Sequence, residues 1–591
     1  MYADVVVLTY QSPDIPTYTY KIPKELEKEI KVGQLVSVPF GKRLPMGVVT
    51  NLGSQIIREV GDIRDISEIL LNQPLLLRRQ IELLKWMAFY YHAPMVNCLE
   101  AILPEIPKKL TYQQAHPRGV LASSSTRRSG PGSTLAHPGG EGNAQTLVLV
   151  PSISRISETL ASYPRAKNYV IYYNERKVSD KFNAWLKILN GSVDFIFGSR
   201  SAIFTPCPNL GKIIIFDEHD GAYKDERSPY FDTFTVAEKN SEITGCELEI
   251  IDSSPRVTTF FAHRDDIGKV REVREVGIKI VSMLEEKAKG NKSPISDLLY
   301  SYLKAAVKKQ KKVLLFLNKK SESGHFYCKS CKFNDWVLTQ PEACPNCQSQ
   351  DLWFYSLNVN SLASLVQKLV PTAKINIIST QPALPARQAT QLATIEIATA
   401  SVFYKLTYLK YDLVAHIATD STLNILDFSS SEKAFTQITS LQKLAKGLLL
   451  LQTYNPDHPV IKTAASGNYN LFYKYHLLER KALLYPPYSL LVKLTIKGKK
   501  EEGLEERTQK LFDALSLIKN SLNSKLYPLI TILGPYRSIF GQKYKKYNII
   551  LKIATDNYSL KTREKAIKSL DPFWKMIPRD WQITIEPDSI N

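Results

Sequence analysis

The 591-residue sequence contains no run of about 18 consecutive apolar residues, the length that a membrane-spanning helix needs. Its first residues, MYADVVVLTYQSPDIP, have neither a basic start nor a long apolar stretch, so no signal peptide is expected. There are only seven cysteines, and they are unevenly used: four form one cluster and three are scattered. This pattern favours a reducing compartment over a disulfide framework, and we expect a cytoplasmic protein.

The sequence also lacks a phosphate loop of the form G-x-x-x-x-G-K-[ST]. What it has in excess is positive charge: 77 Lys and Arg against 57 Asp and Glu give a net charge of +20 and a pI near 9.3. A soluble protein this basic usually binds a polyanion, and nucleic acid is the first candidate. No polybasic segment lies beside an amphipathic anchor, so no membrane partner is expected.

Apolar periodicity and punctuation predict a multidomain α/β protein. Alternating apolar residues predict a small N-terminal β-domain, and a helical period follows it. Two parallel α/β lobes and a C-terminal α+β domain come after a Gly/Ser/Pro-rich stretch that predicts a disordered linker. The expected boundaries are 1–105 for the β-domain with its helical extension, 106–145 for the linker, 146–294 and 295–462 for the two lobes, and 463–591 for the C-terminal domain.

An acidic segment follows a predicted buried strand at 212–216. The continuous apolar run would deliver Asp217, Glu218 and His219 to the carboxyl end of the strand, where α/β sheets bind ligands. Acids in this position are typical of a Mg²⁺ site. Arg200, in the preceding segment GSRSA, could contact a phosphate backbone. The plainer alternative is a strand that ends in solvated acids.

Four cysteines form two C-x-x-C pairs inside the second lobe. Cys328 and Cys331 form the first pair, and Cys344 and Cys347 form the second. This spacing predicts one tetrahedral Zn²⁺ in a ribbon at 326–350. Four protein ligands leave no open position, so the metal would be structural. The alternative is a set of unrelated thiols.

The β-domain carries aromatic and basic residues close together. Tyr18, Thr19 and Tyr20 lie on one predicted strand, and Gly41 and Lys42 lie in a later turn. Aromatic faces stack on bases while cations meet phosphates, so the segment predicts a grip on single-stranded DNA. A half-buried strand with a basic turn is the alternative.

Several segments together resemble the primosomal protein N′ (PriA) replication-restart helicase family. The resemblance rests on VPFGKRLPMGVVT, LVLVPSI, GSRSAIFTPCPNLGKIIIFDEHDGAYK, LLQTYNPDHPVI, ERKALLYPPY, ILGPYRSIFGQKYKKYNIILK and ITIEPDSI, and it runs through most of the chain. It implies a 3′-DNA-binding domain at the N-terminus, two helicase-like lobes, and forked or single-stranded DNA with a 3′ end as partner. Replication and single-strand-binding proteins are the further partners that it implies.

The departures from the family pattern concern the motor. The family's phosphate loop should precede Thr146, where this chain has the linker, and its D-E-E-H box is represented here by Phe216 to His219. Its arginine-finger box aligns with Ser440–Gly447, which contains no arginine. The family binds two zinc ions with eight cysteines, whereas four cysteines leave one. The family's winged-helix domain has no room here.

These departures predict a DNA-binding protein of replication restart in which Asp217, Glu218 and His219 are vestigial. ATP and Mg²⁺ are then not expected to work together in a motor, because neither the loop lysine nor the arginine fingers are present. Two other hypotheses stay open: an active ATP-dependent 3′–5′ DNA helicase of the primosome, and a zinc-ribbon scaffold for protein partners.

Overall fold

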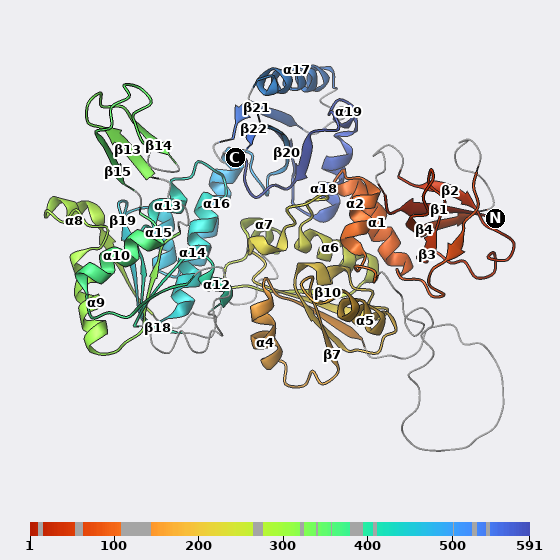
Figure 1. Ribbon diagram of the computed structural model, residues 1–591, viewed down its shortest axis with the longest axis horizontal. Coiled ribbons are helices and arrows are strands. Elements are labelled where there is room, and N and C mark those ends of the chain that lie inside the picture. The colour runs from red at the N-terminus through yellow and green to blue at the C-terminus, as the bar shows by residue number, and fades with distance from the viewer. Residues whose placement is uncertain are drawn as a thin grey trace, which may run out of the picture. The chain divides into compact units, whose positions relative to one another are not determined.

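The chain is described here from a computed structural model, in which it divides into two compact units (Figure 1). Unit 1 comprises Met1–Pro255 and Leu484–Asn591, and unit 2 comprises Arg256–Leu483. The expected linker lies almost wholly outside the described residues. Among the described residues, no helix is both long and apolar enough to cross a membrane. The described residues are 1–9, 16–53, 63–107, 144–263, 276–318, 324–337, 341–355, 357–378, 394–405, 410–499, 502–522, 529–538 and 544–591.

Unit 1 begins with the predicted small β-domain, an antiparallel sheet of order β2-β1-β4-β3-β5. Side chains alternate between its two faces. Val5 and Val7 pack into a core within the domain, whereas Val6 points to the larger core that the two following helices share. The strands are β1 at Tyr2–Val7, β2 at Tyr18–Lys21, β3 at Leu35–Ser37, β4 at Met46–Gly53 and β5 at Glu68–Ile69.

Two helices follow the β-domain, α1 at Arg78–Tyr90 and α2 at Met95–Ile102. Pro94 is the N-cap residue of α2 and separates the two helices, as its fixed φ and missing N–H require. The extension is bonded to the first lobe: Gln80 Nε2 donates to Phe204 O at 2.7 Å, and Trp185 Nε1 donates to Leu75 O at 3.1 Å. The two helices therefore join the β-domain and the first lobe in one core.

The first lobe is a parallel sheet of order β10-β9-β6-β8-β7. Its strands are β6 at Gln145–Leu149, β7 at Tyr169–Tyr172, β8 at Phe195–Gly198, β9 at Leu210–Phe216 and β10 at Glu247–Ile251. Its helices include α4 at Ile153–Ala161, α5 at Val178–Leu189 and α6 at Thr233–Thr244. The parallel pairing confirms the predicted α/β class and brings the carboxyl ends of β6, β9 and β10 together.

Unit 2 contains the second parallel sheet, of order β11-β19-β18-β12-β17-β16. Strand β11, at Gly277–Ser282, pairs with β19, although the expected boundary at 294 placed this segment in the first lobe. The other strands are β12 at Val313–Phe316, β16 at Ile375–Ile378, β17 at Ile395–Ala398, β18 at Tyr411–His416 and β19 at Ala445–Thr453.

Helices cover both faces of this sheet, because alternate strand residues are apolar on each side. Leu315 points to the face that α9 and α10 cover, and Phe316 points to the face that α14, α15 and α16 cover. The five helices are α9 at Asp297–Lys308, α10 at Val359–Leu369, α14 at Ser430–Leu444, α15 at Pro459–Ala465 and α16 at Tyr469–Ala482. Helix α16 belongs to unit 2, although the sequence placed the C-terminal domain from 463.

Two antiparallel sheets complete the chain. The ribbon in unit 2 has the order β14-β13-β15, and the C-terminal part of unit 1 has the order β21-β22-β20-β23. The ribbon strands are β13 at Gly324–Cys328, β14 at Asn334–Val337 and β15 at Leu352–Tyr355. The C-terminal elements include β20 at Ser489–Gly498, α17 at Leu504–Ser521, β21 at Ile530–Arg537, β22 at Lys545–Ala554, α18 at Leu560–Lys568 and β23 at Gln582–Ile585.

Candidate functional site

The acidic segment lies directly after β9, where the sequence predicts it. Ile213 and Ile215 are fully buried and hold the strand in the sheet. Asp217 follows with a left-handed backbone, φ 47°, which Asp tolerates better than most residues. Its N–H donates to Ile251 O on β10 at 2.9 Å. Glu218 is completely buried, so it is not one of the solvated acids that the plainer interpretation of this segment assumed.

Two carboxylates of this site, those of Asp217 and Asp252, are each paired with a neighbouring side chain. Arg155, on α4, forms an ion pair with Asp217. His219 Nδ1 lies 2.7 Å from Asp252 Oδ2, and its backbone N–H donates to the same oxygen at 3.1 Å. Burial alone would raise the pKa of Asp252, but the attraction to His219 and the hydrogen bonds to its carboxylate outweigh burial and lower the pKa.

The same residues show whether the site could hold a Mg²⁺ ion. Ligand atoms of Asp217, His219 and Asp252 lie within 4.8 Å of one another, which is close enough for one shared ion. However, Arg155 already pairs with Asp217, and a histidine is a poor ligand for Mg²⁺, which prefers oxygen ligands in near-octahedral geometry. The side chains present therefore do not fit an ordinary Mg²⁺ site.

Arg200, expected to contact a phosphate, instead holds the turn after the acidic segment. Its guanidinium donates to the carbonyl oxygens of Ala222, at 3.0 Å, and of Lys224, and lies 3.3 Å from Asp225 Oδ2. Three acceptors within the chain thus engage this half-buried side chain, and its contact with a phosphate stays a prediction. A cavity of about 470 Å³ opens beside the turn, and Arg227 contributes a further cation to its wall.

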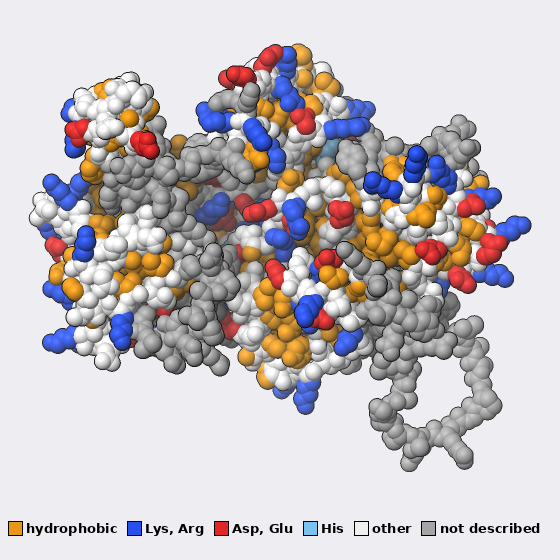
Figure 2. All heavy atoms as spheres, in the orientation of Figure 1, with side chains coloured by type: hydrophobic (Ala, Val, Ile, Leu, Met, Phe, Trp, Pro, Cys, Tyr) orange, Lys and Arg blue, Asp and Glu red, His pale blue; other side chains and the backbone are white. Residues whose placement is uncertain are grey.

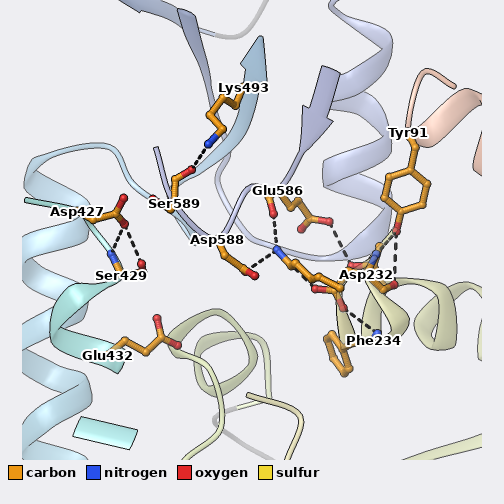
Figure 3. A network of polar contacts seen from close by, with 12 residues as sticks. Tyr91, Asp232, Phe234, Asp427, Ser429, Glu432, Lys493, Glu586, Asp588 and Ser589 are labelled. Atoms are coloured by element: carbon orange, nitrogen blue, oxygen red, sulfur yellow. Dashed lines mark hydrogen bonds and ion pairs between the residues drawn. The ribbon is translucent and has the colours of Figure 1, made fainter. Parts of the chain in front are cut away.

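Lys224 connects this turn to the last residues of the chain. Its Nζ lies 2.7 Å from Asp588 Oδ1 and 3.7 Å from Asp232 Oδ2, and it donates to the carbonyl oxygen of Glu586. Figure 3 shows three of these partners, Asp588, Glu586 and Asp232, close to one another. The side chain of Asp232 also caps α6 by accepting the N–H of Phe234 at 2.8 Å.

A buried arginine continues the same network. Arg563, on α18, is 2% exposed and pairs with Glu238 on α6 and with Glu586 Oε1 at 3.0 Å. Tyr90, on α1, donates its hydroxyl to Glu586 Oε2 at 2.9 Å. Burial alone would raise the pKa of Glu586, but the positive charges of Arg563 and Lys224 lower it. The network therefore holds the first lobe, the helical extension and the C-terminal segment in one charge-compensated cluster.

The predicted DNA grip of the first domain is only partly exposed. The ring of Tyr18 is half-buried and lies 5.1 Å from the ring of Phe40, edge to face, so the strand and the turn 40–43 meet. Lys42 is exposed at the tip of this turn. Gly41 has φ +62°, and its carbonyl oxygen accepts from Arg64 Nη1 at 2.9 Å. Tyr18, Gly41 and Lys42 are thus brought together.

The other two residues of the predicted grip already have partners within the domain. Tyr20 is 4% exposed, its hydroxyl donates to Pro39 O at 3.3 Å, and burial raises its pKa to about 12. Thr19 Oγ1 donates to Asp4 Oδ1 at 2.9 Å. The ring of Tyr20 belongs to the core of the domain, so its stacking on a base stays a prediction.

The four clustered cysteines converge as their spacing predicts. Their Sγ atoms all lie within 4.8 Å of one another, with Cys328 to Cys347 and Cys331 to Cys344 at 3.6 Å each. Tetrahedral Zn²⁺ with Zn–S distances of about 2.3 Å requires sulfur atoms about 3.8 Å apart. The four thiols therefore fit one zinc ion and leave no position open for a substrate.

Sequence reasoning missed four residues of the acidic site and its network. Arg155 stands in a helix whose sequence shows nothing unusual, and Lys224 and Arg563 are single cations in a chain that has many. Glu586 lies in the ITIEPDSI segment, so its position could have drawn attention, but its partner Tyr90 lies 496 positions away in the sequence.

The chain was compared with known proteins. Residues 6–104 match the family model of the PriA 3′ DNA-binding domain. The replication restart protein PriA of Synechocystis is 26% identical over 75% of this chain and 59% of the relative, so the match spans about three fifths of that protein. The namesake from Rickettsia conorii is 25% identical over 92% of this chain and 93% of the relative.

Among solved structures, Mycobacterium smegmatis helicase Lhr bound to ssDNA and AMP-PNP is similar with a TM-score of 0.32 and 10% identity, over 56% of this chain and 43% of that one. A similarity this low carries no inference about function. The match of the first domain and the similarity to PriA proteins over most of the chain support a relationship to the replication restart protein PriA family.

Proposed function

We propose that this protein binds DNA during replication restart and recognises a 3′ strand end or a branched structure through its first domain. The observation that carries the proposal is the match of residues 6–104 to a 3′ DNA-binding domain. The position of Tyr18 beside the basic turn supports it, because an aromatic ring and a nearby cation suit an unpaired base and its phosphate. Replication and single-strand-binding proteins are its proposed protein partners.

The end recognition can be tested by fluorescence anisotropy with two oligonucleotides that differ only in a 3′-hydroxyl or a 3′-phosphate. We expect tighter binding of the hydroxyl end. Tyr18→Ala should weaken binding by about 1–3 kcal/mol, the usual contribution of one stacked base. Tyr20→Phe is the matched control, since it removes only the hydroxyl that bonds Pro39 O inside the core. Equal affinity for both ends would refute end recognition.

We further propose that the chain has no ATP-driven motor. The ion pair of Arg155 with Asp217 supports this, because it neutralises the carboxylate that a catalytic cation would need. The sequence has no phosphate loop, and no arginine stands in Ser440–Gly447. Arginine fingers alone contribute about 10³–10⁵ in rate, and the loop lysine neutralises the nucleotide phosphates.

Phosphate release in the presence of forked DNA and Mg²⁺ tests the missing motor, with a Glu218→Gln variant as control. We expect no DNA-stimulated turnover in either protein. Turnover near about 1 s⁻¹ that the variant abolishes would contradict the proposal, since phosphoryl-transfer enzymes typically run at about 1–100 s⁻¹. That result would instead support the alternative of an active helicase.

One structural zinc ion completes the proposal. Cys328, Cys331, Cys344 and Cys347 would hold it and so fix the turns at the base of the ribbon. A zinc ion with four protein ligands supplies folding energy rather than catalysis.

A further inference from the structure

Lysines gather at one edge of the second parallel sheet. Lys312, Lys374 and Lys410 each stand immediately before a strand, and Lys446 is the second residue of β19. Because all strands of this sheet are parallel, residues that precede them lie along the same amino edge. We call the set at this edge the lysine rim; its members are Lys308, Lys309, Lys311, Lys312, Lys374, Lys410, Lys443 and Lys446.

The strand register confirms that these positions are neighbours along the edge. Val313 on β12 is paired with Leu413 on β18 and with Ile395 on β17, and Ile395 is paired with Ile375 on β16. Adjacent strands lie about 4.8 Å apart, so the row from β19 across β18, β12 and β17 to β16 is about 19 Å long. The end of α9 adds further lysines beside this row.

In the described part of the chain, two carboxylates lie beside the rim, those of Asp412 and Glu396. Asp412 accepts from the backbone N–H of Lys312 at 3.0 Å and lies 3.5 Å from Lys311 Nζ. The other acid at this edge, Glu396, is buried, and burial raises its pKa while it accepts from the hydroxyl of Tyr411. Most of the rim lysines are exposed, and Figure 2 shows Lys and Arg side chains along the edge of the unit that carries α9.

We propose that the lysine rim is a second nucleic-acid contact that binds the phosphodiester backbone of DNA. A row of cations about 19 Å long spans several successive phosphates. A membrane surface fits less well, because the apolar face of α9, with Leu299 and Leu303, is buried against the sheet and cannot enter a bilayer. The proposal rests on the proposed function, since it adds a second contact in unit 2 to the one assigned to the first domain.

The test measures the salt dependence of DNA affinity for the full chain. Four exposed rim lysines, which have no carboxylate partner in the described part of the chain, are changed to Gln: Lys308, Lys309, Lys374 and Lys446. The slope of log K against log[salt] is negative, and each lost phosphate contact reduces its magnitude by about 0.7 for single strands and about 0.9 for duplex. We therefore expect the magnitude of the slope to fall by about three with a single-stranded and with a duplex probe. An unchanged slope with both probes would overturn the proposal.

A matched control removes four charges elsewhere in the same unit. Lys287, Lys289, Lys292 and Lys474 are exposed and lie away from the amino edge, on or just after α8 at Met283–Ala288 and on α16. An equal fall in slope for this control would show a general effect of net charge and would overturn the assignment. Binding of the rim variant to vesicles of anionic lipid is measured in parallel: a loss confined to vesicles, with DNA unaffected, would also overturn it.

The two DNA contacts can fail separately. Preference for a 3′-hydroxyl end tests the first domain, and Tyr18→Ala should remove it while leaving the salt slope nearly intact. The rim variant should lower the slope and keep the end preference, because phosphate contacts carry no information about the end. If the wild type shows no preference for the 3′-hydroxyl end while the rim variant shows the expected change in salt slope, only the proposed function is refuted.

Discussion

His416, the last residue of β18, is a buried histidine that should make unit 2 sensitive to acid. It is 1% exposed, and neither ring nitrogen has a hydrogen-bond partner among the described residues. Its ring lies 5.0 Å from the ring of Phe316, edge to face. Burial without a compensating partner lowers the pKa of His416 to about 3 from its model-peptide value of 6.5.

The sign and the size follow from proton linkage. Below pH 6.5 the unfolded chain protonates His416 while the folded chain does not, so stability falls as the pH decreases and the loss stops only near pH 3. A pH of about 5 lies about 1.5 pH units below the unfolded pKa of His416, so the free energy of unfolding is about 2 kcal/mol lower there than at neutral pH. Near pH 7.5 the contribution is close to zero. His416→Phe should remove this dependence, since Phe keeps the aromatic packing and does not titrate.

The assay is hydrogen–deuterium exchange of the peptides that cover β12 and β18, in wild type and His416→Phe, near pH 7.5 and near pH 5. Comparing two proteins at one pH cancels the intrinsic exchange rate and the titration of other groups such as Glu396. We expect the opening free energy of wild type to fall by about 2 kcal/mol more than that of the variant. Phe435→Leu, at a buried position of the same unit, should destabilise equally at both values. Equal pH dependence in wild type and His416→Phe would refute the reasoning.

Three other predictions follow from the described contacts. Arg155→Ala should uncover binding of Mn²⁺, measured by electron paramagnetic resonance, at the acidic site, with Asp217→Asn added as the variant that abolishes it; tight binding to wild type would contradict the role given to Arg155. Arg563→Ala should lower stability by about 3–5 kcal/mol because two buried carboxylates lose their partner, whereas Arg507→Ala, at an exposed pair, should cost at most about 1 kcal/mol in thermal unfolding. Replacing Cys331 and Cys344 with Ser should reduce zinc by elemental analysis from about one ion per chain to none, and a folded metal-free wild type would argue against the site.

The sequence by itself determined the features that depend on local pattern. Apolar runs separated by Gly or Pro were enough to predict the β-domain, both parallel lobes and the helix break at Pro94. The reason is that the period of apolar residues reflects which face of an element is buried. The two C-x-x-C pairs were enough for the cysteine cluster, since a short turn must bring each pair of thiols together. Motif order was also enough to predict the similarity to PriA proteins.

Only the tertiary structure decided what the side chains of these motifs contact. Tyr18 and Tyr20 share one face of a strand, yet Tyr20 is in the core while Tyr18 reaches the turn at 40–43. Arg200 is of a residue type that often binds phosphate, but its guanidinium donates a hydrogen bond to the turn that follows the acidic segment. Arg155, on α4, forms an ion pair with Asp217 after β9. Ion pairs of this kind join residues far apart in the chain. Their partners depend on how elements pack, which periodicity and spacing do not encode.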